Sequence, residues 1–212
     1  MRALKTRIST GATGLAVAFA LGLATLAPTG QARAEMTPTI DRGHTSVHFS
    51  VMHGGFTPTI YQFRTIEKVD FVFNPKDVSK SKISMVIQAA SLDSNHAFRD
   101  NWARAAAELN VWKYPTITFV STKVWKTGKN TGKVTGNLTL HGVTKPITAD
   151  IRYNKAGRHF TGKHWVHGFI ATAKFKRSDF GLKAFTMVGT LPWIGDEISL
   201  TVLLEQKRAV PK

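Results

Sequence analysis

Residues 135–151 read TGNLTLHGVTKPITADI, and this stretch decides the fold class that we expect for the chain. Apolar and polar residues alternate along both of its arms. Leu138 and Leu140 share one face of the first arm, and Ile147, Ala149 and Ile151 share one face of the second. A period of two predicts two β-strands, each with one buried face and one face in water.

The residues between the two arms, HGVTKP at 141–146, predict a tight turn. Gly142 can adopt a positive φ at little cost, as a turn requires. Pro146 lacks the N–H group that a strand ladder would use, so we expect it at the start of the next strand. The whole stretch therefore predicts an antiparallel hairpin.

The same alternation recurs on both sides of this hairpin. A change of parity predicts a β-bulge near Val120. Residues 154–158 are expected to connect two strands, and residues 178–191 to form an irregular segment. The expected strands outside the hairpin are residues 45–53, 59–64, 69–73, 82–91, 116–125, 165–175 and 198–204.

One segment has a different period. Residues 96–109, HAFRDNWARAAAEL, place Phe98, Trp102 and Leu109 at helical spacings among good helix formers. This pattern predicts one amphipathic helix, which Asp93, Ser94 or Asn95 could cap. Its apolar stripe has to lie against a sheet face or over the mouth of a barrel.

These elements predict an all-β protein, an extended lipocalin-like antiparallel β-barrel of about eight strands with one inserted α-helix. Closure of the sheet would remove its exposed edges, and an eight-stranded barrel can enclose packed side chains or one small ligand. A two-sheet sandwich is the structural alternative. It would fill the same faces with core side chains and leave no cavity.

The first 34 residues have the three parts of a secretory signal peptide. Arg2, Lys5 and Arg7 form a basic region, residues 15–27 are apolar, and residues 32–34 read ARA, a small-x-small cleavage pattern. The apolar run is shorter than the roughly 20 residues of a membrane span, which disfavours a retained anchor. We therefore expect cleavage, export to the periplasm and a single domain over residues 35–212.

The chain is strongly basic, with 29 Lys and Arg against 13 Asp and Glu and a formal net charge of +16. Such a charge attracts polyanions of any kind. For an exported protein the accessible ones are lipid headgroups and envelope polymers, so an anionic membrane surface is a candidate partner and nucleic acid is not expected. The chain has no cysteine, which excludes disulfides and thiolate metal sites.

Motifs for catalysis and metal binding do not appear in the sequence. There is no Gly-x-Ser-x-Gly elbow, no Walker pattern and no carboxylate pair that stands out. His44, His48 and His53 do not converge on a strand, since four residues span about 13 Å and a spacing of five reverses the face. We expect no enzyme activity, no cofactor and no metal site.

The apolar content is high, with 13 Phe, 5 Trp and 5 Met. Composition alone favours a filled core, because a filled interior and a ligand-filled one use the same residues. The alternative is a hydrophobic pocket in which aromatic and methionine side chains contact a ligand.

Six blocks, in order, resemble one known family, the YceI-like periplasmic proteins. The hairpin block is the most specific of them. The matching blocks are IDRGHTSVHF (40–49) with His53, SLD (91–93), RD (99–100), KYPTITFVST (113–122), GNLTLHGVTKP (136–146) and RSDFGL (177–182). Two departures concern the cavity: the segment after Gly55 lacks the family's usual glycine before Phe63, and residues 109–112 lack its usual phenylalanine pair.

The resemblance implies a lipocalin-like barrel that binds a polyisoprenoid or related long-chain lipid, as a monomer or homodimer. Helix residues Phe98 and Trp102 would close one end of the cavity, and His53, Arg99 or Arg177 would meet a polar headgroup. The expected lining residues on the strands are Phe49, Val51, Phe71, Met85, Ile87, Phe119, Leu138, Leu140, Phe169 and Phe175. Two rival functions stay open: a lipid-modifying envelope enzyme, and a basic module that binds anionic polymers or membrane surfaces.

Overall fold

A computed structural model of the chain describes residues 38–185 and 193–211. Of the two units into which the chain divides, Met1–Ala34 and Glu35–Lys212, only the second contains described residues. The expected signal peptide and part of the expected irregular segment 178–191 lie outside the described residues, so both stay predictions there.

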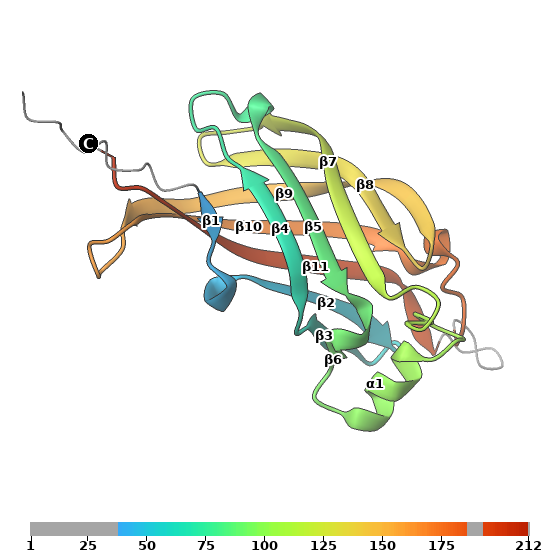
Figure 1. Cartoon of the computed structure of the whole chain (residues 1–212). Coiled ribbons are helices and arrows are strands. Elements are labelled where there is room, and N and C mark those ends of the chain that lie inside the picture. Colours follow the sequence, from blue (N-terminus) through green and yellow to red (C-terminus); the bar gives the residue numbers. More distant parts are fainter. Residues whose placement is uncertain (1–37, 186–192, 212) are drawn as a thin grey trace, which may run out of the picture. The chain divides into compact units, whose positions relative to one another are not determined.

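In the described part of the chain, eleven strands form one antiparallel sheet, which confirms the all-β class (Figure 1). Nine strands have at least seven residues, close to the expected number, and β1 and β6 have two each. The strands are β1 (Thr39–Ile40), β2 (Ser46–His53), β3 (Thr57–Phe63), β4 (Ile66–Val72), β5 (Lys82–Gln88), β6 (Leu92–Asp93), β7 (Thr116–Lys126), β8 (Thr131–Leu140), β9 (Val143–Arg158), β10 (Trp165–Lys176) and β11 (Ile194–Arg208).

The sheet is curled, so that β4, β5, β7 and β8 cross over β9, β10, β11 and β2 (Figure 1). Its strand order is β4-β5-β7-β8-β9-β10-β11-β2-β3-β6, with β1 paired to β11. Among the described strands no ladder joins β4 to β3. The structure is therefore a half-barrel whose described strands leave two open edges, one at β4 and one along residues 57–61 of β3, because β6 pairs only with Gln62 and Phe63.

Side chains cover this edge of β4. Arg42 donates to the carbonyls of Ile66 and Glu67, at 3.1 and 2.9 Å. Gln206, which is only 2% exposed, donates from Nε2 to the carbonyl of Phe71 at 2.7 Å. A buried carbonyl without a hydrogen-bond donor is costly, and these side chains donate to carbonyls that a neighbouring strand would otherwise satisfy.

The predicted hairpin is present as β8 and β9, but its turn is shorter than expected. Leu140 pairs with Val143, and the two turn residues, His141 and Gly142, have φ of 52° and 75°. Two positive φ angles fit the two-residue turns that follow the twist of the strands. The prediction that the turn reaches Pro146 is wrong, because β9 begins at Val143.

Pro146 is tolerated inside β9 because of its register. It stands opposite Asn137, three pairs beyond the closing pair of the hairpin, where antiparallel partners exchange no hydrogen bonds. Its missing N–H would point to the other side of the strand. There β10 first pairs with β9 at Asp150, so the ladder loses no donor.

The bulge predicted near Val120 is present, between Ser121 and Lys123 of β7. One other strand prediction needs correction. Residues 154–158, expected to connect two strands, continue β9 to Arg158, and a bulge opposite Gly168 and Phe169 absorbs the extra residue.

The helix is shorter than predicted. It is α1 (Ala97–Arg104), and its cap is His96, whose ring accepts from the amide of Arg99. Propensity alone would extend it through three alanines, but the chain leaves helical geometry at Ala105 and carries Glu108 to an ion pair with Arg177, at 3.3 Å. Four 3₁₀ turns complete the elements of residues 38–185 and 193–211: Arg42–His44, Val78–Lys80, Ala89–Ser91 and Arg177–Phe180.

Among the described residues, no helix combines the length and the apolar character that a membrane span requires.

Candidate functional site

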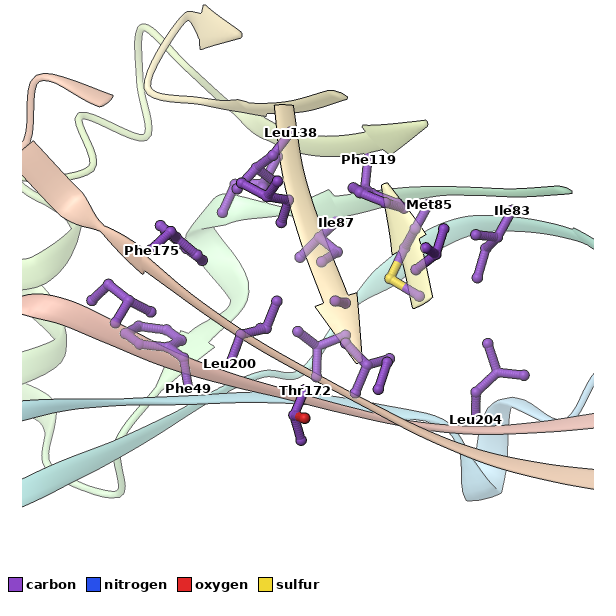
Figure 2. Close-up of a pocket in the computed structure, with 18 of the residues that line it drawn as sticks. Phe49, Ile83, Met85, Ile87, Phe119, Leu138, Thr172, Phe175, Leu200 and Leu204 are labelled. Atoms are coloured by element: carbon purple, nitrogen blue, oxygen red, sulfur yellow. The ribbon is translucent and has the colours of Figure 1, made fainter. Parts of the chain in front are cut away.

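A cavity of about 1010 Å³ lies between the two halves of the curled sheet. Figure 2 shows its side chains pointing toward one another, with Met85 and Leu138 on one side and Phe49 and Leu200 on the other. The inward parity of each strand supplies these apolar groups. A pocket for a small molecule measures roughly 300–1,000 Å³, so this cavity is large enough for a substantial ligand.

The structure places every one of the predicted site residues around this cavity. The strand residues are Phe49, Val51, His53, Phe71, Met85, Ile87, Phe119, Leu138, Leu140, Phe169 and Phe175, and the helix residues are Phe98, Arg99 and Trp102. A sandwich with a completely filled interior is therefore wrong. Contact of these residues with a ligand stays a prediction.

One end of the cavity is rimmed by aromatic side chains, and we call it the aromatic end. Trp102 contacts the ring of Phe185, with centroids 5.1 Å apart, and His53 contacts Trp193 at 5.0 Å. Phe98 is 67% and Trp102 47% exposed. Both residues line the cavity, and part of each side chain contacts solvent. That they close this end of the cavity stays a prediction.

Arg99 is half-buried at the aromatic end, and two of its guanidinium nitrogens donate hydrogen bonds within the protein. Its Nε and Nη2 donate to the hydroxyl and the carbonyl of Ser94, both at 2.9 Å. Its guanidinium also lies over the ring of Tyr61, 5.9 Å from the centroid. These contacts hold the side chain beside the cavity in a fixed orientation.

Arg177, also expected to meet a headgroup, is buried and hydrogen-bonded to the protein backbone. It is 4% exposed and donates to the carbonyls of Gly195, Leu182 and Ala184, at 3.0, 3.1 and 2.7 Å. It also pairs with Glu108. Burial raises the pKa of the Glu108 carboxyl, and the charge of Arg177 acts in the opposite direction. Arg177 therefore ties together the chain segments on either side of β11's start.

A polar pair lies near Phe73, away from the aromatic end. His167 is 4% exposed, and its Nδ1 is 2.8 Å from the hydroxyl of Tyr153, which lines the cavity. Burial disfavours the charged imidazolium and lowers the pKa of His167 to about 4. The imidazole is therefore neutral at pH 7, and the pair adds polarity without charge.

The opposite end of the cavity is basic, and we call it the lysine end. It is lined by Lys76 and Lys82, from the β4–β5 connection and the start of β5, and by Lys126, Lys129 and Lys133 around the β7–β8 turn. Sequence analysis missed this group because its members come from two separate stretches. The local signal was the spacing of four lysines, without an acidic residue, in KVWKTGKNTGK at 123–133.

One group outside the cavity has the atoms of a metal site. Ligand atoms of Asp41, His44 and Glu205 lie within 4.8 Å of one another. However, Asp41 Oδ2 is 2.6 Å from the ammonium of Lys207 and 2.9 Å from His44 Nδ1. Burial would raise the pKa of Asp41, but the hydrogen bonds from Lys207 and His44 outweigh it and hold the pKa at about 2. The group is best described as an ion-pair network.

Comparison with known proteins gives a consistent result. A UPF0312 protein of Vibrio parahaemolyticus is 39% identical over 171 residues, which cover 81% of this chain and 86% of that protein. The crystal structure of Burkholderia cenocepacia BcnA superposes with a TM-score of 0.70, at 22% identity, over 79% of this chain and 99% of that one. A polyisoprenoid binding domain from Saccharophagus degradans, implicated in plant cell wall breakdown, gives 0.59 at 13% identity, over 82% and 99% of the two chains.

The two solved structures share the fold of this chain, and the UPF0312 relative shares its sequence over most of the length. The model of the YceI-like domain matches residues 39–206, from the start of β1 almost to the end of β11. This range contains all the blocks on which the resemblance was based, so that expectation is confirmed. The chain belongs to the YceI-like family.

Proposed function

We propose that this protein is a non-enzymatic carrier that holds one long-chain amphipathic lipid, of polyisoprenoid type, in its cavity. The observation behind the proposal is the cavity itself, about 1010 Å³ in volume and lined largely by apolar side chains from both halves of the sheet. The binding of polyisoprenoids by the Saccharophagus domain, which has the same fold, supports this choice of ligand class.

Physical chemistry explains how such a site would work. Burial of apolar lipid surface contributes about 25 cal/mol per Å², without a directional requirement. A long chain would therefore bind tightly but with loose selectivity for its length. Met85 and the aromatic side chains can adapt to different chain shapes. Residues 1–34 would direct the protein to the periplasm and be removed there.

A matched pair of variants on β10 tests the proposal. Ala171 lines the cavity, whereas its neighbour Ile170 does not and points to the other face of the strand. Ala171→Trp puts a large ring into the cavity, and Ile170→Trp puts the same ring outside it. We expect lipid to co-purify with the wild type and with Ile170→Trp, and to be lost from Ala171→Trp.

The measurement is mass spectrometry of organic extracts from protein purified without detergent. Equal lipid recovery from both variants, or no lipid from the wild type, would contradict the carrier function. A modified lipid that accumulates only with the wild type would instead indicate an enzyme. The mass of the mature chain from fractionated cells tests the export step, with loss of residues 1–34 as the expected result.

A further inference from the structure

We infer that the lysine end of the cavity binds the phosphate-bearing headgroup of the lipid, with the apolar chain directed toward the aromatic end. This inference rests on the proposed carrier function and names the chemistry of the ligand's polar end. It also differs from the expectation, based on sequence, that the headgroup meets His53, Arg99 or Arg177.

The basic side chains converge through the topology of the sheet. Lys76 and Lys82 belong to the connection from β4 to β5 and the start of β5, and Lys126, Lys129 and Lys133 flank the turn between β7 and β8. The two connections lie at the same end of the sheet (Figure 1), and the 3₁₀ turn Val78–Lys80 packs against β7. All five residues contribute to the cavity lining. Lys82 and Lys133 alternate with the inward-facing Ile83 and Val134, so their side chains start from the outer face of the strands, and the inference rests mainly on Lys76, Lys126 and Lys129.

The positive charge of this end is largely uncompensated. Lys133 pairs with Asp150 at 2.7 Å. For Lys76, Lys82, Lys126 and Lys129, the described residues offer no carboxylate within ion-pair distance. Asp77 also lines this end, but its carboxylate accepts from the amide and the hydroxyl of Ser79 and pairs with Lys80 at 3.5 Å.

Several unpaired lysines at a cavity end create a positive potential that an anion would relieve. Lysine binds phosphate as a point charge, and its flexible stem can follow the several oxygens of a phosphate or pyrophosphate group. The side chains of Asn130 and Thr131 line the same end and offer additional hydrogen bonds. This combination favours a multiply charged oxyanion over a neutral headgroup.

The aromatic end does not offer an equivalent site. Arg177 already donates to four carbonyls and to Glu108, and two nitrogens of Arg99 donate to Ser94. The rim of the aromatic end contains the exposed side chains of Phe98 and Trp102. A cavity with one cationic and one aromatic end orients an amphipathic ligand, since each end suits only one part of it.

The test compares a matched pair of probes, geranylgeraniol and geranylgeranyl phosphate, which differ only in the phosphate. We expect the wild type to bind the phosphate on the order of tenfold more tightly than the alcohol at low salt. The advantage should shrink as salt screens exposed charges, with a Debye length of about 10 Å at 0.1 M. Tryptophan fluorescence titration measures both affinities.

Two variants with the same change in net charge separate the lysine end from charge in general. The first replaces Lys76, Lys82, Lys126 and Lys129 by Gln. The second replaces Lys113, Lys155, Lys163 and Lys176 by Gln, all of them exposed and outside the cavity lining. The phosphate advantage should disappear in the first variant and persist in the second, while both keep the alcohol affinity of the wild type.

The outcomes distinguish this inference from the proposed function. Equal wild-type affinity for phosphate and alcohol would overturn the inference and leave the carrier intact, whereas failure to bind either probe would remove the carrier as well. An advantage that survives in the first variant would also overturn the headgroup site. Tight binding of inorganic phosphate alone would also overturn the inference, because it indicates a site for a free anion. Lysine-dependent sedimentation with anionic vesicles, without a preference for the phosphate probe, would overturn it too, because it indicates docking to a membrane.

Discussion

The buried pair of His167 and Tyr153 makes the stability of the protein depend on pH. His167 is 4% exposed, and its Nε2 is buried and has no hydrogen-bond partner among the described residues. Protonation would add a charge in a buried place and leave one N–H donor without an acceptor. Burial accordingly lowers the pKa of His167 from the ordinary 6.5 to about 4.

The size of the effect follows from this pKa. Above pH 6.5 the imidazole is neutral in both the folded and the unfolded chain, so it imposes no penalty. Between pH 6.5 and about 4 the unfolded chain binds a proton that the folded chain does not, and the free energy of unfolding falls as pH falls. The full loss is about 3 kcal/mol, reached below pH 4. That is a large part of the 5–15 kcal/mol typical of a domain.

The perturbation is the double substitution His167→Phe with Tyr153→Phe. It removes the titrating group, keeps aromatic side chains and leaves no orphaned hydroxyl. Urea unfolding at pH steps from 7 to 4 measures the free energy of unfolding. We expect the wild type to lose about 3 kcal/mol more than the double variant over this range.

A single substitution, Tyr153→Phe, serves as the control. Burial, the dominant cause of the lowered pKa of His167, remains in this variant, so most of the pH dependence should persist. If the wild type and the double variant lose stability in parallel, the reasoning about His167 is refuted. An NMR titration in which the ring of His167 protonates near pH 6.5 would refute it directly.

Two further predictions concern the framework of the cavity. Gln206→Leu removes the donor to the carbonyl of Phe71 and should lower the free energy of unfolding by about 1–3 kcal/mol in urea denaturation, whereas an unchanged value would mean that the bond at the β4 edge is dispensable. Gly136→Ala places a methyl group against the ring of Phe119 and 2.6 Å from the carbonyl oxygen of Val120, so we expect a loss of about 1–3 kcal/mol and a shifted Phe119 in a crystal structure.

Strand parity was sufficient to predict the cavity lining. Side chains along a strand alternate between the two faces of the sheet. Where the alternation of apolar and polar residues is regular, apolar residues such as Phe49 and Phe169 therefore mark the face that points inward. The errors occur where the regularity ends. Residues 154–158 lack an apolar alternation, yet β9 continues because β10 pairs with it as far as Arg158, and that pairing is invisible in the local sequence.

The helix shows the opposite limit. The stretch 96–109 has helical propensity throughout, and propensity predicts a helix longer than the observed Ala97–Arg104. The chain departs at Ala105 because Glu108 pairs with Arg177, a residue 69 positions away. Only three-dimensional knowledge of that partner could have predicted where the helix ends.

The lysine end could not be predicted from the charge pattern, since its lysines come from two stretches, 76–82 and 126–133, that are far apart in the sequence. Their proximity is a consequence of register. The ladder between β5 and β7 sets Ser84 opposite Val120, so the start of β5 and the end of β7 come to the same end of the sheet. Once antiparallel pairing and register are known, charges at strand ends gather at the openings of the cavity, where they can act on a bound lipid without disturbing the apolar interior. A search for headgroup sites in related chains should therefore begin from the ladder register and the residues at strand ends, rather than from basic runs in the sequence.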